Sequence, residues 1–414
     1  MCSTSIKAEQ TKRPLPTPTG PQRLCCPTAG LLTRRARPDT VWLMIPALAA
    51  ALVTATPAVP ATSPVIVAPP VLPAPPQAEH AVLNWLPAQA TCAGAPAPTV
   101  VAPAPYPFVT RATAAAAAQP RAFTFMIDAS GQPHSIAPEG VPFVSFTGDL
   151  SPALAASRFE AGRERQGCVI RFSPTVVPVE RADARDAYAA VVLGSGVRSR
   201  QLFERMFPVG STCVRPRPAP QLTAHPEYKT LPKVPGQRQF SMVAFDVDTQ
   251  GVPVGARVAG GTGHAKLDRA SVDAIGRSRF EPGARRGCVY PYLLNADRLP
   301  APSAPDTASM RPAGSTCPAT LHWETKPTLV FPPAYLARAI EGWAIVAFDV
   351  APWGATGNVR ALAAQPAAEF GLHAVSIVQG ARKPASARGH VGCVTVVRFN
   401  VPDLSAPGAE PAVD

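Results

Sequence analysis

The sequence lacks the short motifs that mark familiar catalytic, nucleotide-binding or metal sites. It contains no HExxH, no GxSxG, no Walker loop and no paired acidic motif. The glycine-rich stretch at residues 260–263 is not followed by the Lys-Ser/Thr that a phosphate loop needs. The seven histidines fall at unrelated points of the chain: His80, His134, His225, His264, His322, His373 and His390. We therefore predict a protein that is not an enzyme and that binds no cofactor or metal, unless folding brings a histidine or acidic pair together.

Charge is also sparse, because only 16% of the residues are charged. The 39 lysines and arginines nevertheless exceed the 27 acidic residues and give a net charge of +12, which favours contact with anionic surfaces. Seven of these basic residues lie within the first forty positions, so the remainder of the chain is less basic than the total suggests. Since no basic and aromatic motif accompanies the charge, we do not expect nucleic-acid binding.

No apolar run reaches the roughly 20 residues of a spanning helix. Residues 41–53 form a 13-residue apolar run that follows Arg34, Arg35 and Arg37 and precedes small residues. This length and basic flank predict a secretory signal within a leader at residues 1–55, and an uncleaved membrane anchor is the alternative. We expect the mature protein in the periplasm, or attached to the inner membrane through the leader and facing the periplasm.

Proline is plentiful, with 52 residues, and together with 29 glycines it exceeds what one compact domain uses. Much of it must lie in linkers, of which residues 56–81 are the clearest. The 414 residues leave room for two to four domains of about 100 to 150 residues.

Six cysteines reveal an internal repeat once the three in the leader are set aside. They pair in order at separations of 76, 75 and 76: Cys92 with Cys168, Cys213 with Cys288, and Cys317 with Cys393. The motif Phe-x-[Ile/Val]-x-x-x-Gly lies between the members of each pair, starting at Phe125, Phe245 and Phe348. We predict three modules at residues 82–180, 205–300 and 312–403, with a tail at 404–414.

Periodicity gives each module a coarse structure of α+β class. Alternating apolar residues at 123–127, 243–247 and 346–350 predict half-buried strands, and the turn residues that follow predict hairpins. Helical spacing follows in the second and third modules, and alternation after Cys393 predicts a last strand. Each module should be a roughly three-stranded antiparallel sheet packed with one or two helices.

We interpret the six cysteines as disulfides, since an exported chain reaches an oxidising compartment. Closing a loop of about 76 residues stabilises a module by roughly 4 kcal/mol in the chain-entropy account. Six cysteines allow 15 connectivities, so pairing within modules is inferred from the repeat. Buried free thiols are the main alternative, and no CxxC or His-x-His spacing favours zinc.

The third module resembles the TonB C-terminal domain, the terminal domain of TonB energy transducers. Residues 331–350, FPPAYLARAIEGWAIVAFDV, are similar to its opening: proline and tyrosine, a short alanine and arginine helix, a glycine and an amphipathic strand. Residues 267–283 of the second module are similar to its helix and following segment, whereas the first module keeps only Arg158-Phe159-Glu160 and the strand before it. We identify three divergent tandem copies.

The resemblance implies a function in cell-envelope transport through protein contacts. In this family, an open sheet edge binds an extended segment of a TonB-dependent outer-membrane receptor, the TonB box. Main-chain groups of the sheet and of this peptide then form hydrogen bonds with each other. In the third module the corresponding edge is the last strand: Val394, Thr395, Val396, Val397, Arg398 and Phe399. Residues 41–53 hold no histidine, however, whereas the family's anchor couples to the proton-driven motor through serine and histidine. An envelope scaffold or a cell-wall binding protein without energy coupling is therefore the alternative.

Basic residues recur between the helix and the last strand of every module. The candidates are Arg163 and Arg165, Arg285 and Arg286, and Arg382 and Lys383. They form either a solvated loop or a surface for an anionic partner such as lipid headgroups.

Overall fold

The computed structural model describes residues 79–140, 147–320, 322–325 and 328–402. The leader, nearly all of the predicted linker and the tail lie outside these ranges. All the described residues belong to one compact unit. The described chain is mixed α and β, as the sequence predicts, and it contains more strand than helix.

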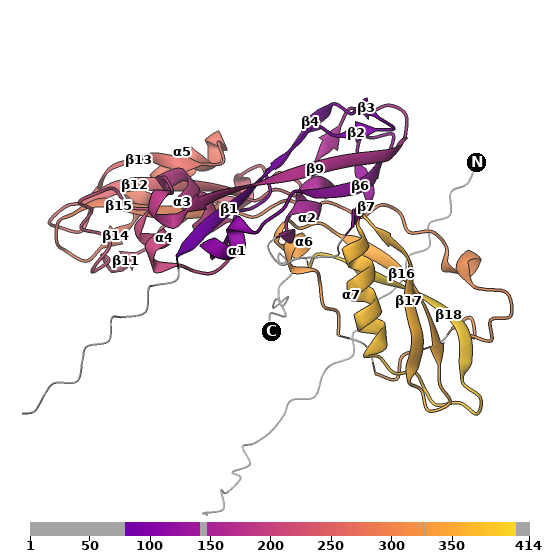
Figure 1. Cartoon of the computed structure of the whole chain (residues 1–414). Helices are drawn as coiled ribbons and strands as arrows, with labels where there is room; N and C mark the ends of the chain where they lie inside the picture. The colour runs from indigo at the N-terminus through magenta and orange to yellow at the C-terminus, as the bar shows by residue number, and fades with distance from the viewer. Residues whose placement is uncertain (1–78, 141–146, 321, 326–327, 403–414) are drawn as a thin grey trace, which may run out of the picture. The chain divides into compact units, whose positions relative to one another are not determined.

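One order of elements, strand, strand, helix and strand, occurs three times (Figure 1). In each case the first strand is central, and the second and last strands pair with it antiparallel on either side. We call the sheets, in chain order, sheet 1, sheet 2 and sheet 3. Sheet 1 uses β6 (Arg121–Ile127), β7 (Pro133–Pro138), α2 (Leu150–Ala155) and β9 (Arg165–Pro178). Sheet 2 uses β12 (Gln239–Val247), β13 (Pro253–Gly261), α5 (Ala265–Arg277) and β15 (Arg285–Leu294). Sheet 3 uses β16 (Gly342–Val350), β17 (Thr356–Gln365), α7 (Ala368–Gln379) and β18 (His390–Phe399).

Sheet 1 departs from the predicted three strands, because it has eight. The additional strands are β1 (His80–Pro87), β2 (Thr91–Cys92), β3 (Ala95–Pro96), β5 (Phe108–Arg111) and β10 (Ser195–Gly196). The long strand β9 makes the larger sheet possible, because three other strands pair with it: β6, β1 and β2. Sheets 2 and 3 have the predicted three strands.

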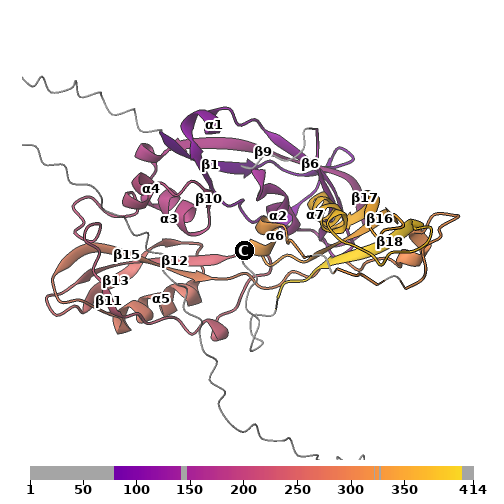
Figure 2. The same cartoon turned by 90° about the horizontal axis from the view of Figure 1, so that it is seen from below.

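The remaining elements are short connections. Two separate ladders join β4 (Thr99–Val101) to β8 (Arg158–Phe159) and β11 (Pro220–Leu222) to β14 (Arg279–Phe280). The other helices are α1 (Ala112–Ala116), α3 (Ala184–Val192), α4 (Arg200–Glu204) and α6 (Pro333–Ala337), with 3-10 turns η2 (Val179–Arg181), η3 (Tyr228–Thr230) and η4 (Thr307–Met310). Figure 2 shows α3 and α4 close to each other, in a part of the chain for which the sequence predicted no element.

The predicted hairpins are confirmed, and their turns show why the sequence signal is strong. The Asp128 carboxylate accepts the backbone N–H groups of Ser130 and Gln132, each at 2.9 Å. Gly131 follows at φ +84°, and a Cβ there would lie 2.1 Å from the carbonyl oxygen of Phe159. Asp248 and Gly251 repeat this arrangement in sheet 2. Only glycine fits this close approach at positive φ.

The predicted core faces are buried in all three sheets. Their inward residues are at most 4% exposed: Phe123, Phe125, Ile127, Val243, Phe245, Val247, Val346, Phe348 and Val350. The three disulfides join Cys92 to Cys168, Cys213 to Cys288 and Cys317 to Cys393, so the predicted pairing is confirmed.

One fully buried arginine connects the surroundings of all three sheets. Arg338, just after α6, is 0% exposed, and its Nε and Nη2 donate to the Asp149 carboxylate at 2.7 and 2.6 Å. It also donates to the carbonyls of Ala104 and Gly236, at 2.9 and 3.2 Å. Its guanidinium lies 3.8 Å from the ring centre of Tyr106. Burial alone lowers the pKa of Arg338, but the Asp149 carboxylate raises it above its usual value, so the group stays charged.

Candidate functional site

The predicted binding strand β18 lies at an edge of its sheet. Within the described part of the chain it pairs with β16 alone, in antiparallel register from Gly342 opposite Phe399 to Phe348 opposite Cys393. An edge strand offers main-chain donors and acceptors on its outer side. The structure thus places the six predicted residues, 394–399, where an additional strand could pair.

In sheet 1 the chain itself fills the corresponding position. Strand β1 runs antiparallel to β9 with Ala81 opposite Pro178 and Pro87 opposite Phe172, and β2 continues to Cys92 opposite Cys168. Figure 1 shows β1 beside the long β9. Between them Ala88 N–H donates to the Arg171 carbonyl at 2.8 Å. In sheet 1 the last strand, β9, therefore pairs with an added antiparallel strand on its outer side, which is the side away from β6.

Sheet 2 has a different edge. Its last strand, β15, carries Pro291 opposite Met242 of β12. Proline has no N–H, so it fits an edge strand where the missing donor faces outward, and it removes that donor from any added strand. Of the three last strands, β9 is thus already paired on its outer side, and β15 lacks one backbone N–H there because of Pro291. β18 contains no proline and has all of its backbone N–H donors.

The start of β18 is covered by its own strap, which we define as residues 315–317. Thr316 N–H donates to the Val391 carbonyl at 3.1 Å, and the Thr316 hydroxyl accepts from Val391 N–H at 2.9 Å. The Ser315 hydroxyl donates to the Gly392 carbonyl at 3.0 Å. The strap ends at the Cys317–Cys393 disulfide, and the turn η4 also contacts β18, with Met310 packed on the cluster that contains Val394. In the described ranges no strand pairs with the outer side of residues 394–399.

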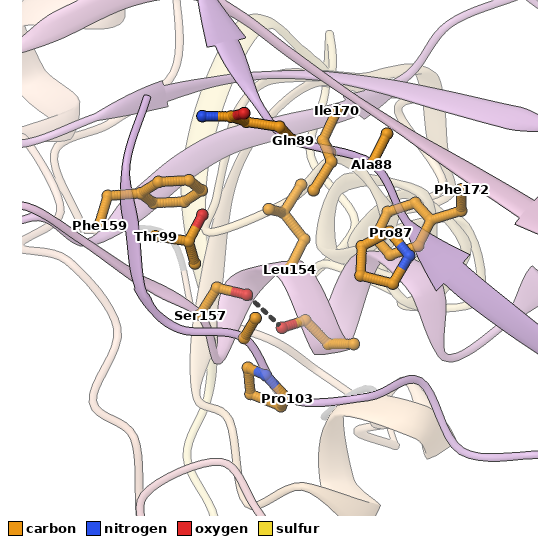
Figure 3. A pocket seen from close by; sticks show the side chains of 12 residues that line it. Pro87, Ala88, Gln89, Thr99, Pro103, Leu154, Ser157, Phe159, Ile170 and Phe172 are labelled. Atoms are coloured by element: carbon orange, nitrogen blue, oxygen red, sulfur yellow. Dashed lines mark hydrogen bonds between the residues drawn. The ribbon is translucent and has the colours of Figure 1, made fainter. Parts of the chain in front are cut away.

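A cavity of about 300 Å³ lies beside sheet 1, between α2, β9 and the chain around β4. Figure 3 shows the Leu154 side chain between the rings of Phe159 and Phe172. The Ser157 hydroxyl donates to the Ala153 carbonyl at 3.0 Å and is therefore already satisfied. The cavity offers apolar surface and no charged lining residue.

A second cavity, of about 610 Å³, lies beside sheet 2 and is lined by Ile275, Ser278, Phe280, Tyr290 and Tyr292, among others. Neither cavity was predicted from the sequence. Their shared Ser-Arg-Phe-Glu motif, at residues 157–160 and 278–281, is a signal that could have pointed to them.

The predicted basic residues do not share one environment. Arg163, Arg286 and Arg382 are exposed, whereas Arg165 and Arg285 are half-buried. Lys383 is only 3% exposed, and its Nζ lies 3.4 Å from the ring centre of Trp323. Burial lowers the pKa of Lys383 to about 8. The arginines are thus the accessible part of these loops.

Lys383 occupies a position that holds phenylalanine in the other two sheets. Its N–H donates to the Gly354 carbonyl at 2.9 Å, as Phe159 does to Gly131 and Phe280 does to Gly251. Those phenylalanines pack on the core rings Phe125 and Phe245, at 5.4 Å each. In sheet 3, Trp323 takes over that stacking on Phe348, at 5.7 Å.

We expect Lys383 to make stability depend on pH. The pKa of Lys383 is about 8 in the folded chain and has an ordinary value of 10.5, so between these values the unfolded chain binds more protons. The free energy of unfolding should therefore rise as pH increases from about 8 to 10.5, and below pH 8 the full cost of burying the charge is present. Lys383→Met should be more stable than the wild type at pH 7 and lose this rise.

Urea denaturation of both chains between pH 7 and 10.5 measures the difference, with Arg382→Met as the exposed control. An unchanged slope in Lys383→Met would show that the lysine titrates alike in the folded and unfolded chain.

In the described ranges, no group of three or more His, Cys, Asp or Glu residues is arranged to hold a metal ion. His264 instead caps α5, its Nδ1 accepting from Leu267 N–H at 3.0 Å. None of the helices in these ranges is long and apolar enough to cross a membrane. No model of a protein family matches the sequence, and no curated protein matches it.

Proposed function

We propose that the protein is an exported cell-envelope protein that binds an extended peptide segment of another envelope protein along the outer side of β18. The resemblance of residues 331–350 and 267–283 to the TonB C-terminal domain suggests this role, with three divergent copies in tandem. A TonB-dependent outer-membrane receptor is the partner class that the resemblance implies. The three disulfides are consistent with an oxidising compartment such as the periplasm.

The observation that carries the proposal is the pairing of β1 with β9. It is an example, within the same chain, of a strand added to the outer side of a last strand. Residues 394–399 of β18 correspond to residues 169–174 of β9, along which the segment from Trp85 to Thr91 runs. They lie at the sheet edge and are rich in β-branched residues, which suit a pleated surface. Strand addition supplies affinity through main-chain hydrogen bonds.

The register identifies the residue of β18 whose peptide group should matter most. Arg171, whose carbonyl accepts from the added segment, is the third residue after Cys168. Pro291 and Val396 are the third residues after Cys288 and Cys393. Because Pro291 keeps its place in the β12 ladder without an N–H, the N–H at this position faces away from the central strand. Val396 therefore presents its N–H and carbonyl to an incoming strand.

Val396→Pro should weaken peptide binding by about five- to a hundredfold while leaving sheet 3 folded. The change removes one outward donor, and an unmet partner costs about 1 to 3 kcal/mol. Isothermal titration calorimetry with synthetic peptides of the extended N-terminal segments of the host's TonB-dependent receptors measures the affinity. Val396→Thr keeps both the N–H and the branched shape, so it should bind like the wild type.

Equal affinity of Val396→Pro and Val396→Thr for a bound peptide would exclude pairing along this edge. If none of the peptides binds the wild-type chain, the alternative of an envelope scaffold without receptor contact replaces the proposal.

A further inference from the structure

The cavities beside sheets 1 and 2 are built from equivalent residues. Ser157 and Ser278 each donate a hydroxyl proton to the carbonyl four residues earlier, at 3.0 Å. Four further pairs line the two cavities at matching places: Leu154 and Ile275, Phe159 and Phe280, Ile170 and Tyr290, and Phe172 and Tyr292. The ladders confirm the match, since Thr99 faces Phe159 as Pro220 faces Phe280. The cavity is thus a recurrent product of this fold.

The sheet 2 cavity has about twice the volume of its counterpart, about 610 against 300 Å³. Its floor is deeply buried, because Phe245, Ile275 and Tyr292 are at most 3% exposed. Its outer wall comes from α4 and the chain after it, where Phe203 and Phe207 are half-buried. This volume falls within the range of small-molecule sites, about 300 to 1,000 Å³.

Two of the hydroxyl groups that line this cavity are already hydrogen-bonded to the backbone. The Ser278 hydroxyl bonds to Ala274, and the Tyr292 hydroxyl donates to the Ala224 carbonyl at 3.1 Å. The interior therefore offers mainly hydrocarbon and aromatic surface to a ligand, and such a surface favours an apolar occupant over water.

The lining contains a single charged residue, Arg217. It is exposed, and its guanidinium lies 3.9 Å from the ring centre of Phe203, at the cavity wall. No acidic residue lines the cavity. A planar guanidinium suits a carboxylate, which it can bind with two hydrogen bonds. The smaller sheet 1 cavity has no charged lining residue.

We propose that the sheet 2 cavity binds a long-chain fatty acid, with the alkyl chain among the aromatic residues and the carboxylate at Arg217. The apolar interior supplies affinity in proportion to the alkyl surface that it removes from water. Arg217 selects for an anionic head group. This site is independent of the edge of β18, and its test does not depend on a protein partner.

Equilibrium dialysis of palmitate against the full-length, disulfide-bonded chain tests the site. We expect one bound palmitate per chain. Thr223→Trp, which places an indole at the half-buried rim of the sheet 2 cavity, should weaken binding at least tenfold. Ala102→Trp makes the matching change in the sheet 1 cavity, where the exposed Ala102 is the counterpart of Thr223, and should leave binding unchanged.

The head group is tested with Arg217→Gln and with hexadecanol, which has the same chain without a charge. Arg217→Gln should weaken palmitate binding about tenfold at pH 8 and change hexadecanol binding less than twofold. A palmitoyl lysophospholipid is the last probe, because it distinguishes a site for a free fatty acid from a site for a lipid that carries the same acyl chain.

Three results would overturn the proposal: no palmitate binding, equal binding by wild type and Thr223→Trp, or preference for the lysophospholipid over palmitate. If Arg217→Gln weakened the binding of palmitate and of hexadecanol equally, the proposed contact between Arg217 and the carboxylate would be excluded.

Discussion

Arg338→Met will lower the free energy of unfolding by about 3 to 5 kcal/mol, because it leaves the Asp149 carboxylate among buried groups without its counter-ion. The change also removes the donors to Ala104 and Gly236 and the stacking on Tyr106. Those partners belong to segments that flank all three sheets. Urea denaturation of the disulfide-bonded chain measures the loss from the midpoint and slope.

Two further variants separate charge from packing. Arg269→Met alters an exposed arginine of α5 and should change stability by no more than about 0.5 kcal/mol. The double variant Arg338→Met, Asp149→Leu removes both charges and should regain part of the loss, since an unpaired buried charge costs more than a missing pair. A loss below 1 kcal/mol in Arg338→Met would mean that the pair contributes little.

Removing the Cys317–Cys393 disulfide by serine substitution at both positions will lower the free energy of unfolding by about 4 kcal/mol. The bridge closes a loop of 76 residues and fixes the strap beside the start of β18. In the chain-entropy account the loss arises because the unfolded chain gains freedom. Thermal unfolding followed by circular dichroism measures it, with the exposed His322→Ala as control. A loss as small as that of His322→Ala would show that the strap holds without the bridge.

The hairpins could be predicted because their signals are local. Asp128 and Gly131 lie within the turn that they shape, and alternating residues such as Phe123 and Phe125 report burial directly. The cysteine pairs were predictable because a repeat distinguishes one connectivity among many. Both kinds of signal, the local turn pattern and the repeat, can be recognised in a single sequence.

The long-range partners could not be predicted in this way. Nothing in residues 80–87 specifies pairing with residues 172–178, because an alternating strand fits many edges. Asp149 and Arg338 are 189 positions apart, and their burial follows from packing. Lys383 was expected in a basic loop because lysine is seldom buried, and only the three-dimensional equivalence with Phe159 and Phe280 reveals its place.

The pairing of β1 with β9 also sets the order in which the chain can fold. Paired residues of these strands are 85 to 97 positions apart, so β1 must wait for a distant segment of the chain before it can join its sheet. Until then its apolar residues lack their partner, whereas the hairpins of sheets 2 and 3 close over short loops. Sheet 1 should therefore be the slowest to mature, as non-local strand pairing generally is.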